Sequence, residues 1–223
     1  MNTVNQLGIY NMAMGKIGVS RFIQSLQDTS VQKQTCDVFW ELCRDQCLSD
    51  FPWPFAMRFA TLQLVSKIVP PWCYVYGYPS DCMAARILLP TPNTVSPAPP
   101  GYINSMIGLF SANWIQQWWD CRIPYQTVEN ESAGGLAIAT DLQFATLMYT
   151  ARVTSYNLWT PAFVNCLTLL LASNIAGPLS NSPKYTTDLG RAYEAALLKA
   201  GASAMNEQQE QPEPDSEFIM TRG

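Results

Sequence analysis

The sequence predicts an α+β fold: a helical bundle built from N- and C-terminal helices, with a central β-rich insertion and an extended C-terminal tail. Three observations predict it. Apolar residues recur at helical spacing before residue 51 and after residue 154. Ten of the sixteen prolines lie between Pro52 and Pro100, which excludes long helices there. Hydrophobic residues make up 48% of the 223 residues, enough for a well-filled core. The predicted units are a bundle of residues 1–51 and 154–205, an insertion of residues 52–153, and an extended acidic tail of residues 206–223.

Two helices are predicted before the insertion. Thr3 can cap the first, which ends at Gly15 and Gly18. Residues 28–30, Asp-Thr-Ser, can cap the second helix, which runs to about residue 50. Pro52 and Pro54 stop it, because proline lacks the amide donor. The apolar side of this helix is expected to face the core, and its charged residues are expected on the other side. The apolar residues are Val31, Val38, Phe39, Leu42, Cys43 and Leu48, and the charged ones are Asp37, Glu41, Arg44 and Asp45.

The insertion is expected to consist of strands and fixed turns. Strands are predicted over residues 55–65, 72–78, 86–89, 102–110 and 144–153, with a hairpin joining 125–128 to 136–140 through Gly134-Gly135. Residues 90–101 contain five prolines and predict a stiff loop, whereas 114–119 fit either a strand or a helical turn. Pro79-Ser80-Asp81 predicts a turn in which Asp81 can accept from the backbone amides that follow it.

Two further helices are predicted after the insertion. Thr160 can cap the first of them, with Pro161 at its first helical position. Gly177-Pro178 is expected to end it, and Ser182-Pro183 to begin the last helix. This helix is expected to fade into the polar, proline-broken residues 206–213, which we expect to be extended or disordered unless bound.

Charge is sparse and unevenly distributed. Only 13% of residues are charged, so much of the surface must be neutral or covered by other protein. Residues 206–223 hold five acids and one base, and the rest of the chain is balanced, with twelve of each. No basic surface for gripping phosphates is predicted, so DNA could pass by this protein without being held.

The chain contains no histidine, which removes Ser-His and Cys-His catalysis and His-ligated metals. No glycine loop for phosphate is recognisable, since Gly134-Gly135 lacks the following lysine. A carboxylate pair for glycoside hydrolysis stays open, because its members can lie far apart in the sequence. The candidates have plainer roles on solvated faces or in turns, and the chain is predicted not to be an enzyme. They are Glu41, Asp45, Asp81, Asp120, Glu129 and Glu131.

Seven cysteines, an odd number, exclude a complete disulfide framework within one chain. No secretory signal is visible, and the most apolar stretch, residues 163–176, is shorter than a bilayer span. We therefore expect free thiols in a reducing cytoplasm and no membrane. Cys36, Cys43 and Cys47 share one helix face, which fits either a thiolate site or packing. Their spacing lacks the close pairs that zinc needs, so packing is favoured and neither a metal nor a cofactor is predicted.

Aromatic residues supply the best binding candidate. Trp72, Tyr74, Tyr76 and Tyr78 alternate along one strand, so one face carries four rings. Trp114, Trp118 and Trp119 follow in the loop region. Such rings can stack on sugars or anchor a protein partner, and they can equally fill the core of the insertion.

Four segments, in order, resemble the head-to-tail adaptors of short-tailed bacteriophages, also called tail tubular protein A. The first runs from Ala13 to Gly18 and continues into residues 23–30. The second is Phe51-Pro52-Trp53-Pro54-Phe55-Ala56, and the third is the turn of residues 76–83, Tyr-Gly-Tyr-Pro-Ser-Asp-Cys-Met. The fourth joins residues 149–154 to 159–164. Residues 90–135 are longer and more aromatic than the family pattern, and the sequence shows no basic patch.

The resemblance implies a structural virion protein, made in the host cytoplasm and located in the neck of the particle. Copies would form a dodecameric ring between the portal protein and the tail nozzle protein, extending the DNA channel and, in some relatives, carrying tail fibres. A closed ring needs two different faces on each copy. The alternative hypothesis is a carbohydrate- or receptor-binding tail module that uses the aromatic strand.

Residue roles follow from this expectation. Pro52, Trp53 and Pro54, with Pro79 and Asp81, would form the structural junction between bundle and sheet. The rings of Trp72, Tyr74, Tyr76, Trp114, Trp118 and Trp119 would face the nozzle or fibres. The C-terminal residues would dock into an apolar pocket of the portal or a neighbouring ring protein, with acids meeting basic groups at its rim. These docking residues are Glu217, Phe218, Ile219, Met220 and Arg222.

Overall fold

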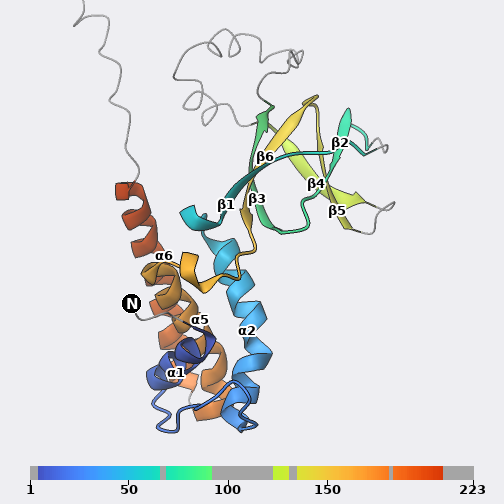
Figure 1. Cartoon of the computed structure of the whole chain (residues 1–223). Coiled ribbons are helices and arrows are strands. Elements are labelled where there is room, and N and C mark those ends of the chain that lie inside the picture. The colour runs from blue at the N-terminus through green and yellow to red at the C-terminus, as the bar shows by residue number, and fades with distance from the viewer. Residues whose placement is uncertain (1–4, 66–68, 92–122, 131–134, 181–182, 208–223) are drawn as a thin grey trace, which may run out of the picture.

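The structure is a computed structural model that describes residues 5–65, 69–91, 123–130, 135–180 and 183–207. Its architecture is α+β (Figure 1). N- and C-terminal helices pack together into a bundle, and two small antiparallel sheets lie between them in the sequence and beyond one end of the bundle in space. The C-terminal tail after residue 207 lies outside the described residues.

Among the described residues, the bundle has four helices: α1 (Gln6–Lys16), α2 (Val31–Asp50), α5 (Pro161–Ser180) and α6 (Pro183–Glu207). Helix α5 is the central one and packs against each of the other three. It has no charged residue, and twelve of its twenty residues are buried. It is also long and apolar enough to cross a bilayer by length and composition, but 67% of that window is buried inside the molecule. In this fold α5 is therefore the core helix of the bundle.

The helix ends follow simple capping chemistry, with two corrections to the sequence prediction. The amide of Gly8 donates to the Asn5 side chain at 2.8 Å, so Asn5 caps α1, and Thr3 lies outside the described residues. Ser30 caps α2 as predicted. The prediction that Gly177-Pro178 ends α5 is wrong, since the helix continues to Ser180. Proline so close to the end forfeits only one backbone hydrogen bond, and the Ser180 hydroxyl adds one by donating to the Ala176 carbonyl.

The described part of the insertion forms two three-stranded antiparallel sheets. The first has the order β1 (Met57–Thr61), β6 (Ala145–Ala151), β3 (Cys82–Pro90), and the second β2 (Tyr74–Gly77), β5 (Gly135–Thr140), β4 (Tyr125–Asn130). Residues from both sheets fill one shared core, including Tyr76, Leu88, Ile138 and Leu147. The predicted hairpin is confirmed by the pairing of β4 with β5.

Strand lengths differ from the sequence prediction. The strand expected over residues 55–65 is shorter, because Pro54–Ala56 form a single 3-10 turn before β1. The strand expected over residues 86–89 is longer, and β3 accommodates its length with irregular register against β6. Residues 102–110 and 114–119, for which strands or a turn were predicted, lie outside the described residues.

Candidate functional surfaces

The junction between bundle and sheets is built around Trp53. Its side chain is 2% exposed, and its indole N–H donates to the Cys47 carbonyl at 2.7 Å, near the end of α2. The ring contacts Phe51, Phe55 and Phe163 edge-on or tilted, with centroid distances of 4.9, 6.1 and 5.1 Å. Pro52 and Pro54 flank it and redirect the chain from α2 toward β1. Trp53 therefore fills the space where the chain leaves the bundle.

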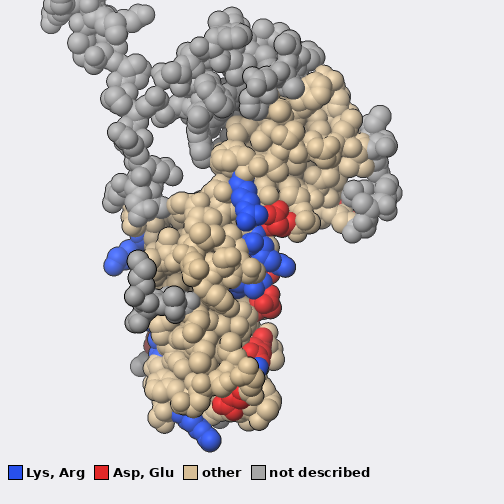
Figure 2. Space-filling view, in the orientation of Figure 1, with Lys and Arg blue, Asp and Glu red and all other residues tan. Residues whose placement is uncertain are grey.

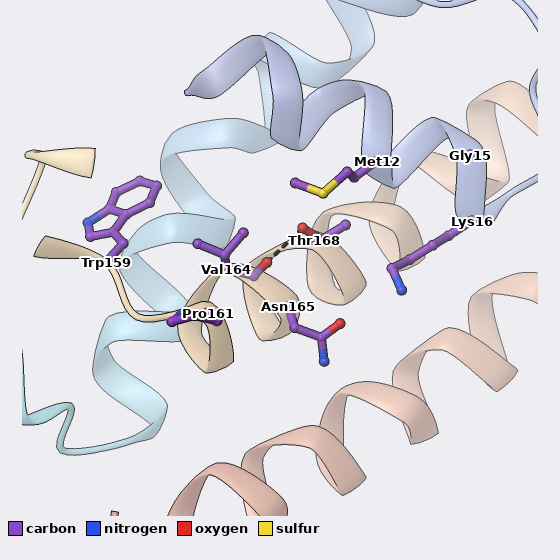
Figure 3. A pocket seen from close by; sticks show the side chains of 8 residues that line it. All are labelled: Met12, Gly15, Lys16, Trp159, Pro161, Val164, Asn165 and Thr168. Atoms are coloured by element: carbon purple, nitrogen blue, oxygen red, sulfur yellow. Dashed lines mark hydrogen bonds between the residues drawn. The ribbon is translucent and has the colours of Figure 1, made fainter. Parts of the chain in front are cut away.

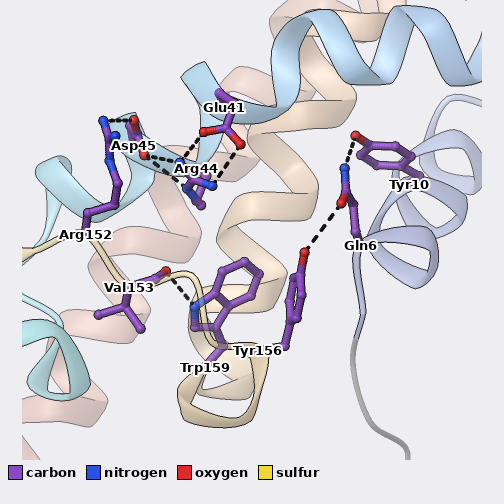
Figure 4. Close-up of polar contacts among 9 residues, drawn as sticks. All are labelled: Gln6, Tyr10, Glu41, Arg44, Asp45, Arg152, Val153, Tyr156 and Trp159. Atoms are coloured by element: carbon purple, nitrogen blue, oxygen red, sulfur yellow. Dashed lines mark hydrogen bonds and ion pairs between the residues drawn. The ribbon is translucent and has the colours of Figure 1, made fainter. Parts of the chain in front are cut away.

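Arginine side chains connect the sheet to α2 across the same junction (Figure 4). Arg152, just after β6, donates to the Asp45 carboxylate at 2.6 Å. Arg44 is 6% exposed and binds both Asp45 and Glu41. On β3, Arg86 donates to the Ser49 carbonyl at 2.7 Å and to the Thr150 hydroxyl at 2.9 Å. The orientation of the sheets on the bundle thus depends on a few charged contacts.

Asp81 belongs to this network, but not as the sequence predicts. Its carboxylate accepts from Arg58 at 2.6 Å and from the Tyr149 hydroxyl at 2.9 Å, rather than from the amides that follow it. The turn itself is closed by the backbone, because the Cys82 amide donates to the Pro79 carbonyl. The Asp81 carbonyl in turn accepts from the Arg152 amide at 2.7 Å. Asp81 therefore connects the turn to β1 and β6.

The aromatic strand is only partly available to a partner. Tyr76 is 3% exposed, and its hydroxyl donates to the Leu142 carbonyl at 2.8 Å, so the expectation that this ring faces a partner is corrected: it is a core residue. Tyr74 and Trp72 are half-buried, and the Trp72 indole donates to Gln126 on β4. Burial raises the pKa of the Tyr76 hydroxyl to about 12. Trp114, Trp118 and Trp119 lie outside the described residues.

The thiols of the bundle are packing residues. Cys36, Cys43 and Cys47 are fully buried and, together with Trp40, form the side of α2 that faces the core. Burial raises the pKa of Cys36 to about 12 and that of Cys43 to about 11. A neutral thiol is a small apolar group, which is what this core requires. Among the described residues, no cluster of three or more His, Cys, Asp or Glu side chains could hold a metal ion.

The carboxylates considered for hydrolysis have structural partners. Glu41 and Asp45 share Arg44, and Asp81 is paired with Arg58. Glu129 lies on the exposed side of β4, and Asp120 and Glu131 lie outside the described residues. Within the part of the chain that the structure describes, the paired acids therefore support the fold.

The sequence prediction for the core-facing side of α2 is confirmed for Cys43 and Leu48, which are buried, and is wrong for three other residues. Val31, Val38 and Leu42 were expected to face the core, but their exposed fractions are 67%, 74% and 61%. The inner face consists mainly of Cys36, Trp40, Cys43, Cys47 and Leu48. Arg44 is also buried, although the sequence predicted it on the outer side. We call Val31, Val38 and Leu42 the α2 apolar row. Acidic side chains accompany this side of the bundle, while most of the visible surface is uncharged (Figure 2).

An open groove of about 540 Å³ lies on the bundle where α1 meets α5 (Figure 3). Apolar side chains make most of its lining, among them Met12, Trp159, Pro161 and Val164. Lys16 and Asn165 extend toward its open side, where α6 passes. We call this the α1–α5 groove. Its volume falls within the range of ordinary ligand pockets.

Sequence reasoning missed both of these surfaces. One signal for the α1–α5 groove was present: Lys16 is the only charged residue in α1 and α5 together, and Asn165 is a polar residue in an apolar helix. The α2 apolar row had an ambiguous signal, because α2 carries two apolar stripes and only packing decides which one is buried.

No family model matches the chain, and the search of curated proteins found no match.

Proposed function

We propose that this protein is a structural head-to-tail adaptor of a short-tailed bacteriophage, forming a ring between the portal and the tail nozzle. The observation that carries the proposal is that the family-like segments meet in space. Trp53 of the second segment contacts Phe163 of the fourth, and Asp81 of the third bonds to Tyr149 of the fourth. These contacts join the bundle to the sheets and so support the architecture, which fits a protein that acts through shape and adhesion.

Two unlike faces are available for a closed ring. Helix α2, which carries the α2 apolar row, lies on one side of α5, and helix α6, where Leu198 is 79% exposed, lies on the other (Figure 1). A heterologous contact between the α2 face of one copy and the α6 face of the next generates a ring when the rotation closes. The sparse charge of the body suits a surface that is covered in the assembled particle.

The C-terminal residues 217–222 remain the proposed docking element for the portal or a neighbouring ring protein, and the sheets would face the nozzle or fibres. DNA would pass through the ring without specific binding, because the body of the chain has as many acids as bases. A carbohydrate-binding module has less support, since Tyr76 is buried and Trp72 and Tyr74 are only half-exposed.

Electron microscopy of the purified protein mixed with its portal protein tests the proposal. We expect rings with twelvefold symmetry seated on the portal, with no nuclease or glycosidase activity in the same sample. A protein that stays monomeric at high concentration and does not bind the portal would refute it.

A further inference from the structure

We infer that the α1–α5 groove is the docking site for the C-terminal segment of the same chain, residues 208–223, with Phe218, Ile219 and Met220 in the apolar part of the groove. This contact belongs to the free chain, and the segment would have to leave the groove to dock on the portal or a neighbouring ring protein. The inference therefore goes beyond the ring proposal and does not depend on it. Three properties of the groove and the segment support it: charge, length and polar chemistry.

Charge is complementary between the two. The helices that form the groove, α1 and α5, carry Lys16 as their only charged residue, and it lies at the groove. The segment of residues 208–223 holds four acids and one base. The N-terminal end of α5 at Pro161 also reaches the groove, and the positive end of a helix dipole favours carboxylates. An acidic segment with an apolar patch therefore matches a mostly apolar groove that has one lysine, Lys16, and the N-terminal end of α5 beside it.

The length of the chain permits this contact within one molecule. Gly201 of α6 lies against the Phe51 ring, which contacts Trp53, which in turn contacts Phe163 in the first turn of α5. Helix α6 continues for six residues beyond this level, or roughly 9 Å. The eleven residues from Glu207 to Phe218 can span up to about 36 Å when extended. The groove beside the start of α5 is thus within reach of the segment.

The dimensions and polar groups of the groove suit a short extended peptide. Its lining follows α5 from Pro161 to Thr168, about 10 Å along the helix axis. Three extended residues cover about the same distance. The Asn165 side chain is exposed and points to the open side, where its amide can pair with the backbone of an extended chain (Figure 3).

Photo-crosslinking of the full chain without portal tests the inference. The photoreactive residue p-benzoyl-phenylalanine replaces Phe218, which keeps an aromatic ring at this position. On irradiation it inserts into nearby C–H bonds, and those of the Met12 side chain in the groove react readily. We expect crosslinks to residues 12–16 or 159–168 in a product that migrates as a monomer at every protein concentration. The matched control carries the same group at Gln211, outside the apolar patch, and should give much less of this product.

Charge reversal supplies the second measurement. Lys16→Glu should lower the crosslink yield about fivefold, as expected for an inverted rim charge pair. Adding Glu217→Lys to that variant should restore it. Lys16 is exposed, so neither change threatens the fold. Crosslinks elsewhere on the chain, crosslinks that form only between two chains, or a yield indifferent to both reversals would overturn the inference. Because no portal is present, failure here would leave the ring proposal standing.

Discussion

At the residue scale, the junction depends most on Trp53. It is the largest fully buried side chain of the protein's described part, and it combines ring contacts with a hydrogen bond to the last turns of α2. Asp81 has a smaller role, because both it and Arg58 are partly exposed and water screens their attraction. The two residues therefore differ in how much stability they provide, although both belong to family-like segments.

Replacement of Trp53 should separate these contributions. Trp53→Ala is expected to lower the free energy of unfolding by about 3–5 kcal/mol, because it leaves a cavity among three rings. Trp53→Phe keeps an aromatic ring but leaves the Cys47 carbonyl unpaired, and should cost roughly 1–3 kcal/mol. Leu158→Ala, at a side chain 53% exposed near the same junction, is the control and should change stability by less than about 0.5 kcal/mol. Urea denaturation measures all three, and equal losses for Trp53→Ala and Leu158→Ala would contradict the assigned role.

The buried thiols predict how stability responds to alkali. Burial raises the pKa of both Cys43 and Cys166 to about 11, from an ordinary value near 9. Above pH 9 the unfolded chain therefore loses protons that the folded chain retains, so the free energy of unfolding falls as pH rises. Each thiol contributes at most about 1.4 kcal/mol per pH unit. Denaturation curves at pH 8, 9 and 10 should show this decline, and the double variant Cys43→Ala, Cys166→Ala should show a smaller slope. An unchanged slope would mean that these thiols do not govern it.

At the element scale, two arginines attach the sheets to α2, and they contribute unequally to stability. Arg86 is half-buried and donates to the Ser49 carbonyl close to the C-terminal end of α2, whereas Arg152 is 49% exposed and pairs with Asp45. Burial lowers the pKa of Arg86, but its ordinary value is so high that it stays charged. A partly buried carbonyl that loses its donor costs more than an exposed ion pair.

Substitution of these arginines should reflect that difference. Arg86→Met is expected to lower the free energy of unfolding by about 2 kcal/mol, since the Ser49 carbonyl and Thr150 hydroxyl lose their partner. Arg152→Met should cost about 0.5 kcal/mol, and this loss should shrink further in 0.5 M salt. Thermal and urea unfolding in low and high salt measure both. A larger loss for Arg152→Met would show that the exposed pair is the stronger connection.

The elements also show where sequence reasoning succeeds. Ser30 and Pro52 bracket α2, and Thr160-Pro161 begins α5, because caps and prolines act locally on the backbone. The buried face of α2 is a tertiary matter: its two apolar stripes compete, and the stripe with Cys36, Cys43 and Trp40 is the one that fits against α1 and α5. The side-chain partners of Asp81 on β1 and β6 depend on long-range pairing, which no local pattern encodes.

At the scale of the whole molecule, the α2 apolar row is the surface that assembly should cover. Val38→Asp and Leu42→Asp each place a charge on this face, where a neighbouring copy would bury it at a cost of several kcal/mol. We expect rings to be lost while the free energy of unfolding of the isolated chain changes by less than about 0.5 kcal/mol. Light scattering and electron microscopy measure assembly. Thr127→Glu, at an exposed position of β4 in the second sheet, adds a charge away from α2; it is the control and should leave rings intact. Rings that persist in both aspartate variants would exclude this face.

Neither the α2 apolar row nor the α1–α5 groove could be derived from the sequence. The groove forms where α1 and α5 meet, and the row is exposed because the other side of α2 packs against the bundle. The overall α+β arrangement could be, since proline density and helical periodicity divide the sequence into three parts. Composition and periodicity therefore predict the fold class, whereas tertiary packing decides which surfaces are exposed.

The sheets are connected to the bundle at two neighbouring points. The chain departs at Trp53 and returns at Val153, and both residues belong to the same buried cluster. An inserted unit whose entry and exit points are adjacent can be exchanged for another, because the helices pack around the same aromatic cluster whichever insertion follows. Under the proposed ring function, swapping residues 57–151 between two such proteins would transfer the preference of one for the component that binds its sheets, while the helical host stays unaltered.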